Sequence, residues 1–197
     1  SSDLGNGIFT SKKGHIIEGQ WQNDVVQGLA EATYLDGSIY IGNYLSGKPH
    51  GLGKIIYSDG GSYPGSWVNG RIEGAGKAFF ADGTFYEGNF KNAKQHGMGK
   101  IIYNDGHSFN GQWVDGLKQG QGLEIQADGS TYQGTFIAGR PHGKGKLKLL
   151  NGFEYFGDWI DGEISGYGQI TYSNGNVYVG NLIQAQPNGL GKMTYIS

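Results

Sequence analysis

Histidine is the first residue type in this 197-residue chain whose regular spacing could indicate a metal site. Three histidines recur at intervals of 46 positions, at His50, His96 and His142. Imidazole is a common zinc ligand, and such ligands lie about 2 Å from the ion. The chain repeats every 23 residues, as shown below, and two strands per repeat would set successive histidines about 19 Å apart. One metal ion therefore cannot bind two of them, and we expect loop histidines that bond to the backbone.

Carboxylates form a second regular series. An aspartate precedes a glycine in five consecutive repeats, at Asp36, Asp59, Asp82, Asp105 and Asp128. Acid–base catalysis needs two carboxyl groups that face one pocket in different environments, and a repeat supplies identical environments instead. The sequence also contains no nucleophile elbow, phosphate loop or HExxH motif. We interpret these aspartates as turn residues, and we expect no enzymatic activity, no metal site and no cofactor.

Lysines form a third series, which could bind anionic lipid. Their column holds Lys54, Lys77, Lys100, Lys146 and Lys192, and a basic border opposite the aspartates holds Lys48, Arg71, Lys94 and Arg140. Basic side chains near an anionic membrane contribute about 1 kcal/mol each. Lysines on an exposed sheet face also serve solubility alone, so a lipid site is one of two interpretations. The net charge of −2 predicts no nucleic-acid partner.

Glycine indicates the architecture that must hold these side chains. The chain contains 39 glycines, far above the usual frequency of roughly 7%. They recur at a step of 23 residues without insertion, most visibly as Gly-x-Gly pairs such as Gly51 with Gly53. Each repeat reads as two short strands and two turns, so successive strands must be antiparallel neighbours. Helices are disfavoured, because each glycine inside one costs about 1 kcal/mol relative to alanine.

Aromatic residues flank one glycine of each repeat at alternate strand positions, as at Tyr40, Gly42 and Tyr44. Residues two apart share a face of a strand, so a ring can lie over the bare backbone of a glycine in an adjoining strand. We expect the rings to form a thin core along one sheet without a second layer, and a groove for protein partners. The ring set comprises Tyr40, Tyr44, Tyr63, Trp67, Tyr86, Phe90, Phe109, Trp113, Tyr132, Phe136, Tyr155 and Trp159. Tryptophan recurs every 46 residues, which indicates either interdigitating neighbours or duplication of an ancestral pair of repeats.

The unit YIGNYLSGKPHGLGKIIYSDGGS resembles the MORN repeat, in which Tyr-x-Gly-x-aromatic is followed by Gly-Lys-x-x-Gly-x-Gly and Asp-Gly. The resemblance covers essentially the whole chain, with departures at Ile17 in the first unit and at Leu182 and Ala185 in the last. It implies an all-β fold, an elongated single-layer twisted antiparallel sheet of tandem 23-residue β-hairpins about 80 Å long. Residues 1–197 would form one continuous array of about eight to nine units, with partial units at both ends.

The resemblance also implies a function. The chain is similar to the pure-array cytoskeletal MORN-repeat scaffolds of parasitic protists, and phosphoinositide binding is often attributed to the family. We therefore expect a non-enzymatic scaffold that organises cytoskeletal or membrane-associated assemblies and binds protein partners there. The alternative is a module that tethers to anionic phospholipid, and such binding would weaken with salt. The expected location is the cytoplasm, on the cytoskeleton or the cytoplasmic face of a membrane.

The ends of the array predict self-association. The chain begins and ends on the second strand of a repeat without a polar cap, and an unpaired strand edge invites another chain. We expect a two-fold homodimer in which the last units of two copies pair. The candidate interface residues are Ile170, Tyr172, Tyr178, Leu182, Leu190, Met193 and Tyr195.

Overall fold

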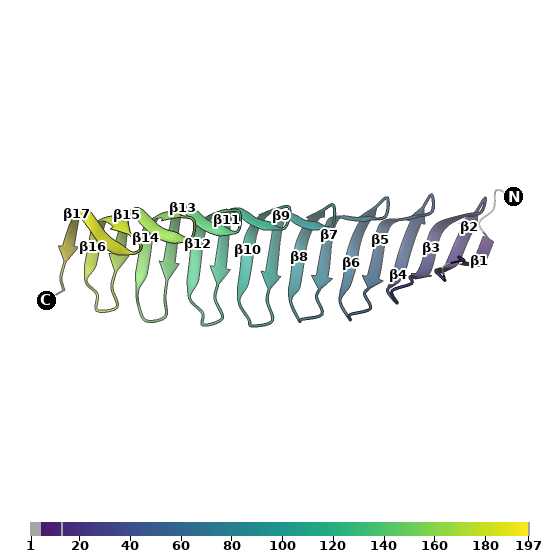
Figure 1. The fold of residues 1–197 in the computed structure, drawn as a ribbon, viewed down its shortest axis with the longest axis horizontal. Coiled ribbons are helices and arrows are strands. Elements are labelled where there is room, and N and C mark those ends of the chain that lie inside the picture. Colours follow the sequence, from purple (N-terminus) through teal and green to yellow (C-terminus); the bar gives the residue numbers. More distant parts are fainter. Residues whose placement is uncertain (1–4, 13, 197) are drawn as a thin grey trace. The chain divides into compact units, whose positions relative to one another are not determined.

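A computed structural model describes residues 5–12 and 14–196, which form β-strands joined by short turns (Figure 1). These described residues contain no helix. The chain divides into two compact units, Ser1–Gln95 and His96–Ser197, here called unit 1 and unit 2. The unbroken 23-residue period of the sequence does not mark this division.

The strands follow the repeat closely, and from β2 onward strands of seven and nine residues alternate. Unit 1 contains β1 (Gly5–Thr10), β2 (Ile16–Gln22), β3 (Val25–Thr33), β4 (Ile39–Leu45), β5 (Lys48–Ile56), β6 (Ser62–Val68), β7 (Arg71–Phe79) and β8 (Phe85–Lys91). The chain continues through β9 (Lys94–Ile102). Unit 2 contains β10 (Ser108–Val114), β11 (Leu117–Ile125), β12 (Thr131–Ile137), β13 (Arg140–Lys148), β14 (Glu154–Ile160), β15 (Glu163–Thr171), β16 (Val177–Ile183) and β17 (Gln186–Thr194).

Within each unit, every strand pairs antiparallel with the next one along the chain. The registers align the glycines of neighbouring strands, as in Gly53 opposite Gly65. The predicted all-β fold of tandem antiparallel hairpins is thus confirmed. One detail is wrong: His50, His96 and His142, which we expected in loops, lie in β5, β9 and β13. Only Ser46 and Gly47 turn the chain, and β5 already begins at Lys48.

The two borders of each sheet carry different turns. On one border a two-residue turn has positive φ at both positions, 51° at Asn69 and 81° at Gly70, which is the geometry that tight hairpins require. On the other border, residues 57–61 link two strands, and only Gly60 has positive φ, at 92°. The Asp-Gly pair is therefore not a two-residue hairpin turn with positive φ at both positions. The longer connection needs only one left-handed residue, because the Asp59 carboxylate accepts a hydrogen bond of 2.9 Å from the Gly61 backbone N–H.

The interpretation of the aspartates as turn residues is confirmed by this hydrogen bond, which recurs from repeat to repeat. Each aspartate accepts from the backbone N–H two residues later, at 2.8 to 3.0 Å. The backbone N–H group is also the main cause that lowers the pKa of three of these carboxyl groups, Asp36, Asp82 and Asp128. Ionised aspartate therefore suits this turn.

The core of each unit lies on one face of its sheet, here called the ring face. In unit 1 the Tyr63 ring is 1% exposed and lies over Gly65 of its own strand and Gly76 of the next strand. A Cβ atom added to Gly76 would overlap the phenol of Tyr63. The expected packing of rings over glycines is therefore confirmed, and each ring also covers a glycine of its own strand. Glycine serves here by close approach, since any larger residue would displace the ring.

Neighbouring rings interlock edge to face along each unit. The Trp67 ring inserts between Tyr40 and Tyr63, with centroid separations of 5.0 and 5.8 Å. In unit 2, Phe136 lies in the same way between Phe109 and Tyr132, at 4.9 and 5.1 Å. Such T-shaped pairs contribute about 0.5–1.5 kcal/mol each beyond the burial of their area. Repeats therefore interdigitate, as the first of our two interpretations of the alternating tryptophans predicted.

Candidate functional site

The rings predicted to form a partner groove are buried, with exposed fractions from 0% to 7%. These rings therefore support the surface of the ring face and contribute little exposed area to it. Their direct contact with a partner stays a prediction. Burial raises the pKa of one tyrosine in each of five repeats to about 12, at Tyr40, Tyr63, Tyr86, Tyr132 and Tyr155. These phenols stay neutral at physiological pH, and each donates a hydrogen bond to a backbone carbonyl oxygen three residues later.

A hollow of about 340 Å³ opens on the ring face of unit 1. Its lining includes Tyr63 and Phe90, which belong to the row of interlocked core rings, here called the ring ladder. It also includes the buried side chains of Ile72 and Ala78. Other repeats hold isoleucine at the position of Ala78, for example at Ile170. The hollow thus lies where most other repeats place a larger side chain. It is a concave apolar surface at the small end of the range of ligand pockets, roughly 300–1,000 Å³.

The mouth of this hollow is aromatic. Tyr57 and Phe80 both line it and are 38% and 44% exposed. Gly61 also lines the hollow and brings no side chain. Burial, and secondarily the charge of Asp59, raises the pKa of Tyr57. The hollow therefore offers two accessible ring surfaces beside one carboxylate.

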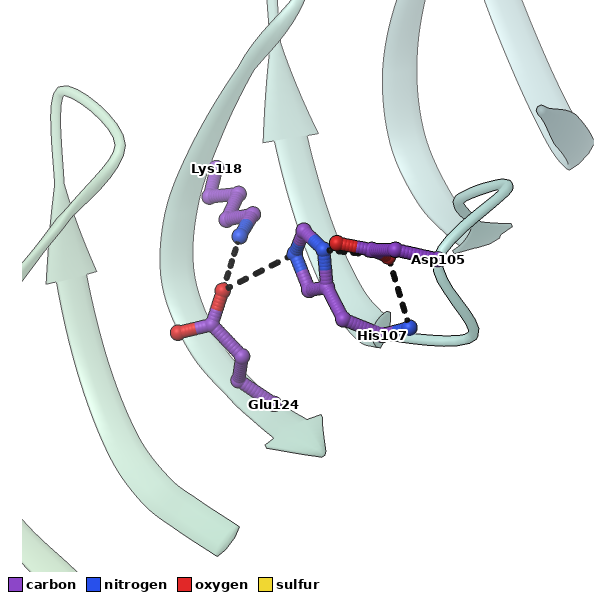
Figure 2. Close-up of polar contacts among 4 residues, drawn as sticks. All are labelled: Asp105, His107, Lys118 and Glu124. Atoms are coloured by element: carbon purple, nitrogen blue, oxygen red, sulfur yellow. Dashed lines mark hydrogen bonds and ion pairs between the residues drawn. The ribbon is translucent and has the colours of Figure 1, made fainter. Parts of the chain in front are cut away.

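A polar cluster occupies the ring face of unit 2 (Figure 2). Lys118 and Glu124 form an ion pair in which each side chain is only 13% exposed. The Oε1 atom of Glu124 also lies 3.8 Å from Nε2 of His107, and Nδ1 of His107 lies 3.4 Å from Oδ1 of Asp105. Figure 2 shows His107 between the carboxylates of Glu124 and Asp105, with Lys118 above Glu124. A buried pair of this kind offsets its desolvation cost only when both partners are present.

Aromatic rings surround the charged groups of this cluster. The Lys118 ammonium lies 5.1 Å from the centroid of the Phe109 ring, a cation–π contact that further compensates its burial. The His107 imidazole stacks on Tyr103 with a centroid separation of 3.9 Å and an angle of 9°. Burial is the main cause that raises the pKa of Tyr103, and the carboxylates of Glu124 and Asp105 add to it. The donors and acceptors of the cluster are satisfied mostly by one another, which suits a structural or binding role.

The hollow and the polar cluster occupy the same positions of the repeat. Gly61, Ile72 and Ala78 of unit 1 correspond, two repeats later, to His107, Lys118 and Glu124 of unit 2. Our sequence analysis missed both features. A signal was available, because the column of Ala78 and Glu124 otherwise holds larger apolar residues in this part of the chain, at Ile55, Ile101, Leu147 and Ile170.

The predicted lysine column lies on the opposite face of each sheet, here called the lysine face. All five side chains are exposed. Lys77 pairs with Glu87 at 3.1 Å and Lys146 pairs with Glu154 at 3.0 Å, and the hydrogen bond from Lys146 is the main cause that lowers the pKa of Glu154. Strand alternation places exposed apolar residues on this face as well, among them Leu52. The ion pairs of Lys77 and Lys146 partly neutralise the positive charge of the column.

The predicted dimer residues fall into three groups. Ile170, Tyr178 and Leu182 lie in the core of unit 2, with exposed fractions of 0% to 5%. Tyr172 and Met193 are half-buried. Leu190 and Tyr195 are 87% and 73% exposed. Only this last pair is freely accessible to a partner chain.

Two of the three regularly spaced histidines contact the backbone as expected, although they do so from strands and not from loops. The backbone N–H of Asn69 donates to Nδ1 of His50 at 3.5 Å, and that of Asp161 donates to Nδ1 of His142 at 3.4 Å. Nδ1 of His96 instead lies 3.6 Å from a carboxylate oxygen of Asp115. Nowhere in the described ranges 5–12 and 14–196 do three or more His, Cys, Asp or Glu side chains gather as a metal ion would require. That same part of the chain has no helix with the length and apolarity for a membrane crossing.

Several solved structures are similar to this chain. The TCP domain of SAS-4 from Drosophila melanogaster, in complex with a proline-rich motif of Ana2, matches with a TM-score of 0.47 and 12% identity over 90% of both chains. The TCP10c domain of Sas-4 from the same organism matches with a TM-score of 0.40 and 10% identity over 97% of this chain and 99% of that one. The TCP10 domain of Danio rerio CPAP, in complex with a STIL peptide, gives 0.34 and 16% over 97% and 93%. No curated protein sequence matches the chain.

A family model described as MORN repeat matches seven consecutive stretches of the sequence, residues 40–62, 63–85, 86–108, 109–131, 132–152, 155–177 and 178–197. The match begins after the stretch in which Ile17 replaces the tyrosine and Ala30 replaces a glycine of the repeat. From residue 40 to residue 197 the matched stretches carry the same glycines and rings that build the core of both units, and the chain belongs to the MORN repeat family.

Proposed function

We propose that the chain is a non-enzymatic scaffold that binds protein partners on the ring face of its sheets. The observation that carries the proposal is the apolar hollow of unit 1, with Tyr57 and Phe80 exposed at its mouth. Concave apolar surfaces rimmed by a few polar groups are typical of binding sites. The interlocked rings beneath it form a rigid platform, so little ordering of the scaffold opposes binding. Its partners would belong to cytoskeletal or membrane-associated assemblies.

Two equally exposed residues on opposite faces allow a matched test. Phe80 on the ring face and Val68 on the lysine face are both 44% exposed. Proteins captured from an extract of the organism's cells by the wild-type chain should be lost with Phe80→Ser and kept with Val68→Ser. Equal capture by the two variants would reject the ring face as the binding surface. Circular dichroism of both variants checks that they stay folded.

A second candidate function is tethering to anionic phospholipid through the lysine face. It is supported by the exposed lysine column and the exposed apolar residues beside it. The ion pairs of Lys77 and Lys146 weaken it. Sedimentation with vesicles that contain PIP2 should show binding that decreases when Lys54 and Lys100 are changed to glutamate. A lack of binding at low salt would remove this function.

Self-association is a further part of the proposal. It is supported by the exposed side chains of Leu190 and Tyr195 on the β17 side of unit 2. Light scattering at tens of micromolar should give the mass of a dimer, and Leu190→Ser with Tyr195→Ser should return the mass of a monomer. A monomeric wild-type chain at that concentration would reject dimerisation.

A further inference from the structure

The position of Gly61 holds an aromatic ring in several other repeats. His107 occupies it in unit 2 and stacks on Tyr103. Two further rings at this position contact the tyrosine of the next connection: His15 faces Tyr34 edge-on at 5.8 Å, and Phe153 faces Tyr172 at 6.3 Å. The fold therefore accepts a ring here on either of two aromatic neighbours. Gly61 is the one glycine at this position of the repeat.

Both aromatic neighbours are present around Gly61, although the ring itself is missing. Tyr57 precedes Gly61 by the same number of residues as Tyr103 precedes His107, and Phe80 follows it as Tyr34 follows His15. Both residues line the hollow. Unit 1 thus presents the walls of a ring-binding site beside the hollow, whereas a Cβ atom added at Gly61 itself would lie 3.1 Å from the Phe79 carbonyl oxygen and from Oδ1 of Asp59. The chain's own His107 shows how a planar ring fits such walls.

The charge at the hollow distinguishes one kind of ring from another. In unit 2, Oδ1 of Asp105 lies 3.4 Å from Nδ1 of His107. Asp59 holds the same place in unit 1 and is the one charged residue among the described residues that line the hollow. A ring that carries an N–H group and positive charge complements this carboxylate, whereas a phenyl ring does not.

We propose that the hollow of unit 1 binds a histidine side chain of a protein partner, stacked on Tyr57 with a ring nitrogen facing the Asp59 carboxylate. This inference rests on the proposed function, because it names the group that the ring face would recognise. In effect the partner supplies to unit 1 the imidazole that unit 2 carries within its own chain.

The probe is N-acetylhistidine methylamide, titrated into the full chain at pH 6, where free imidazole is mainly protonated. The ring resonances of Tyr57 and Phe80 should shift and saturate. The affinity should exceed that of N-acetylphenylalanine methylamide by about fivefold, as expected for a charge-assisted hydrogen bond at a partly exposed site. Shifts that do not saturate, or an equal or higher affinity for the phenylalanine compound, would overturn the proposal.

Two kinds of variant make the test specific. Gly61→His supplies the ring from within and should abolish binding, and Ala78→Ile, which copies Ile170, should do the same by filling the hollow. Asp59→Asn should remove the preference for histidine while the turn is kept, because Asn151 accepts the same backbone hydrogen bond at 2.9 Å in its own repeat. Asp82→Asn is the matched control in the next repeat and should change nothing. Unchanged binding by Gly61→His would contradict the assigned location.

The outcome is separable from that of the proposed function. The titration uses a small probe and requires no natural partner. If the probe fails to bind while Phe80→Ser still loses captured proteins, the histidine site is wrong and the scaffold function stands. If the probe binds while capture is the same for the Phe80 and Val68 variants, the site stands and the ring face is not the main partner surface.

Discussion

The hollow of unit 1 and the polar cluster of unit 2 occupy equivalent positions of the repeat, yet they differ in chemistry. In unit 1 these positions hold Gly61, Ile72 and Ala78, and the surface is open and apolar. In unit 2 they hold an imidazole and a nearly buried ion pair that fill the same space. The ring ladder beneath is alike in both, with edge-to-face contacts near 5 Å.

This difference shows that the residues that stabilise the fold are separate from the residues that vary on its surface. The glycines and rings recur because each depends on the close approach of the other. The three positions above them are free to vary, since the rings do not require any one side chain there. A scaffold built in this way can present a different surface in each repeat while its backbone stays the same.

Alkaline pH should destabilise both units, and unit 1 at the lower pH. The folded-state pKa of about 12 exceeds the usual value near 10, so these tyrosines contribute fully below pH 10 and their contribution is lost as the pH rises toward 12. Each contributes up to about 2–3 kcal/mol. Unit 1 has three of them and two further tyrosines of raised pKa, Tyr44 and Tyr57. Unit 2 has two of them, because Phe109 replaces one, and one further tyrosine of raised pKa, Tyr103.

Hydrogen exchange measured by mass spectrometry between pH 9 and 12 reports on each unit separately, after correction for the intrinsic rate. Protection in unit 1 should fall at lower pH than protection in unit 2. The reverse order would show that the phenols do not control stability in this range.

Substitution of a ring-covered glycine should destabilise both regions equally. In Gly76→Ala the added methyl group meets Tyr63, and in Gly122→Ala it meets Phe109. Displacement of a buried ring should cost about 3–5 kcal/mol in either unit. Urea unfolding gives the measurement. Gly5→Ala is the control, because nothing lies within 4 Å of an added Cβ there, and its effect should stay within about 0.5 kcal/mol. A clear difference between Gly76→Ala and Gly122→Ala in the loss of unfolding free energy would contradict the claim that both units have the same core of rings and glycines.

Loss of one charge should affect unit 2 alone. Lys118→Ala removes the ammonium partner of the Glu124 carboxylate at a site where it is 13% exposed, and we expect a cost of about 3 kcal/mol. The double variant Lys118→Ile with Glu124→Ile copies Ile164 and Ile170 of a later repeat and should be neutral or stabilising. Thermal unfolding distinguishes the two, and a double variant less stable than Lys118→Ala would contradict the assignment of the cost to an unpaired charge.

Filling the hollow should have the smallest effect and the opposite sign. Ala78→Ile adds apolar atoms that touch Ile72 and Phe90, and we expect a gain of about 0.5–2 kcal/mol in the free energy of unfolding. Ala75→Ile on the exposed lysine face is the comparison and should change little. Destabilisation by Ala78→Ile in urea melts would indicate that the site is already full.

The strands and the core of rings and glycines could be predicted from the sequence. The same residue types recur every 23 residues, and each of these glycines leaves space for a ring above it. The turn conformation could not be derived from the Asp-Gly pair alone. Such a pair tolerates positive φ at both positions, but the length of the connection and the hydrogen bond to Asp59 decide which residues adopt it.

The candidate site lies at positions where the residue types depart from the repeat. An analysis of the residues that recur therefore misses it. Gly61 and Ala78 look unremarkable one at a time, and Lys118 and Glu124 look like ordinary surface charges. Their significance depends on side chains that come together from neighbouring strands on one face. Comparison within each column would have identified the departures, but the stacking of His107 on Tyr103 required coordinates.

A crystal structure of the Gly61→His variant tests most directly whether the two regions are one site with different occupants. The introduced imidazole should stack on Tyr57 with a centroid separation near the 3.9 Å seen between His107 and Tyr103, and it should fill the mouth of the hollow. An imidazole turned toward solvent, with the hollow still open, would contradict the equivalence on which the account depends.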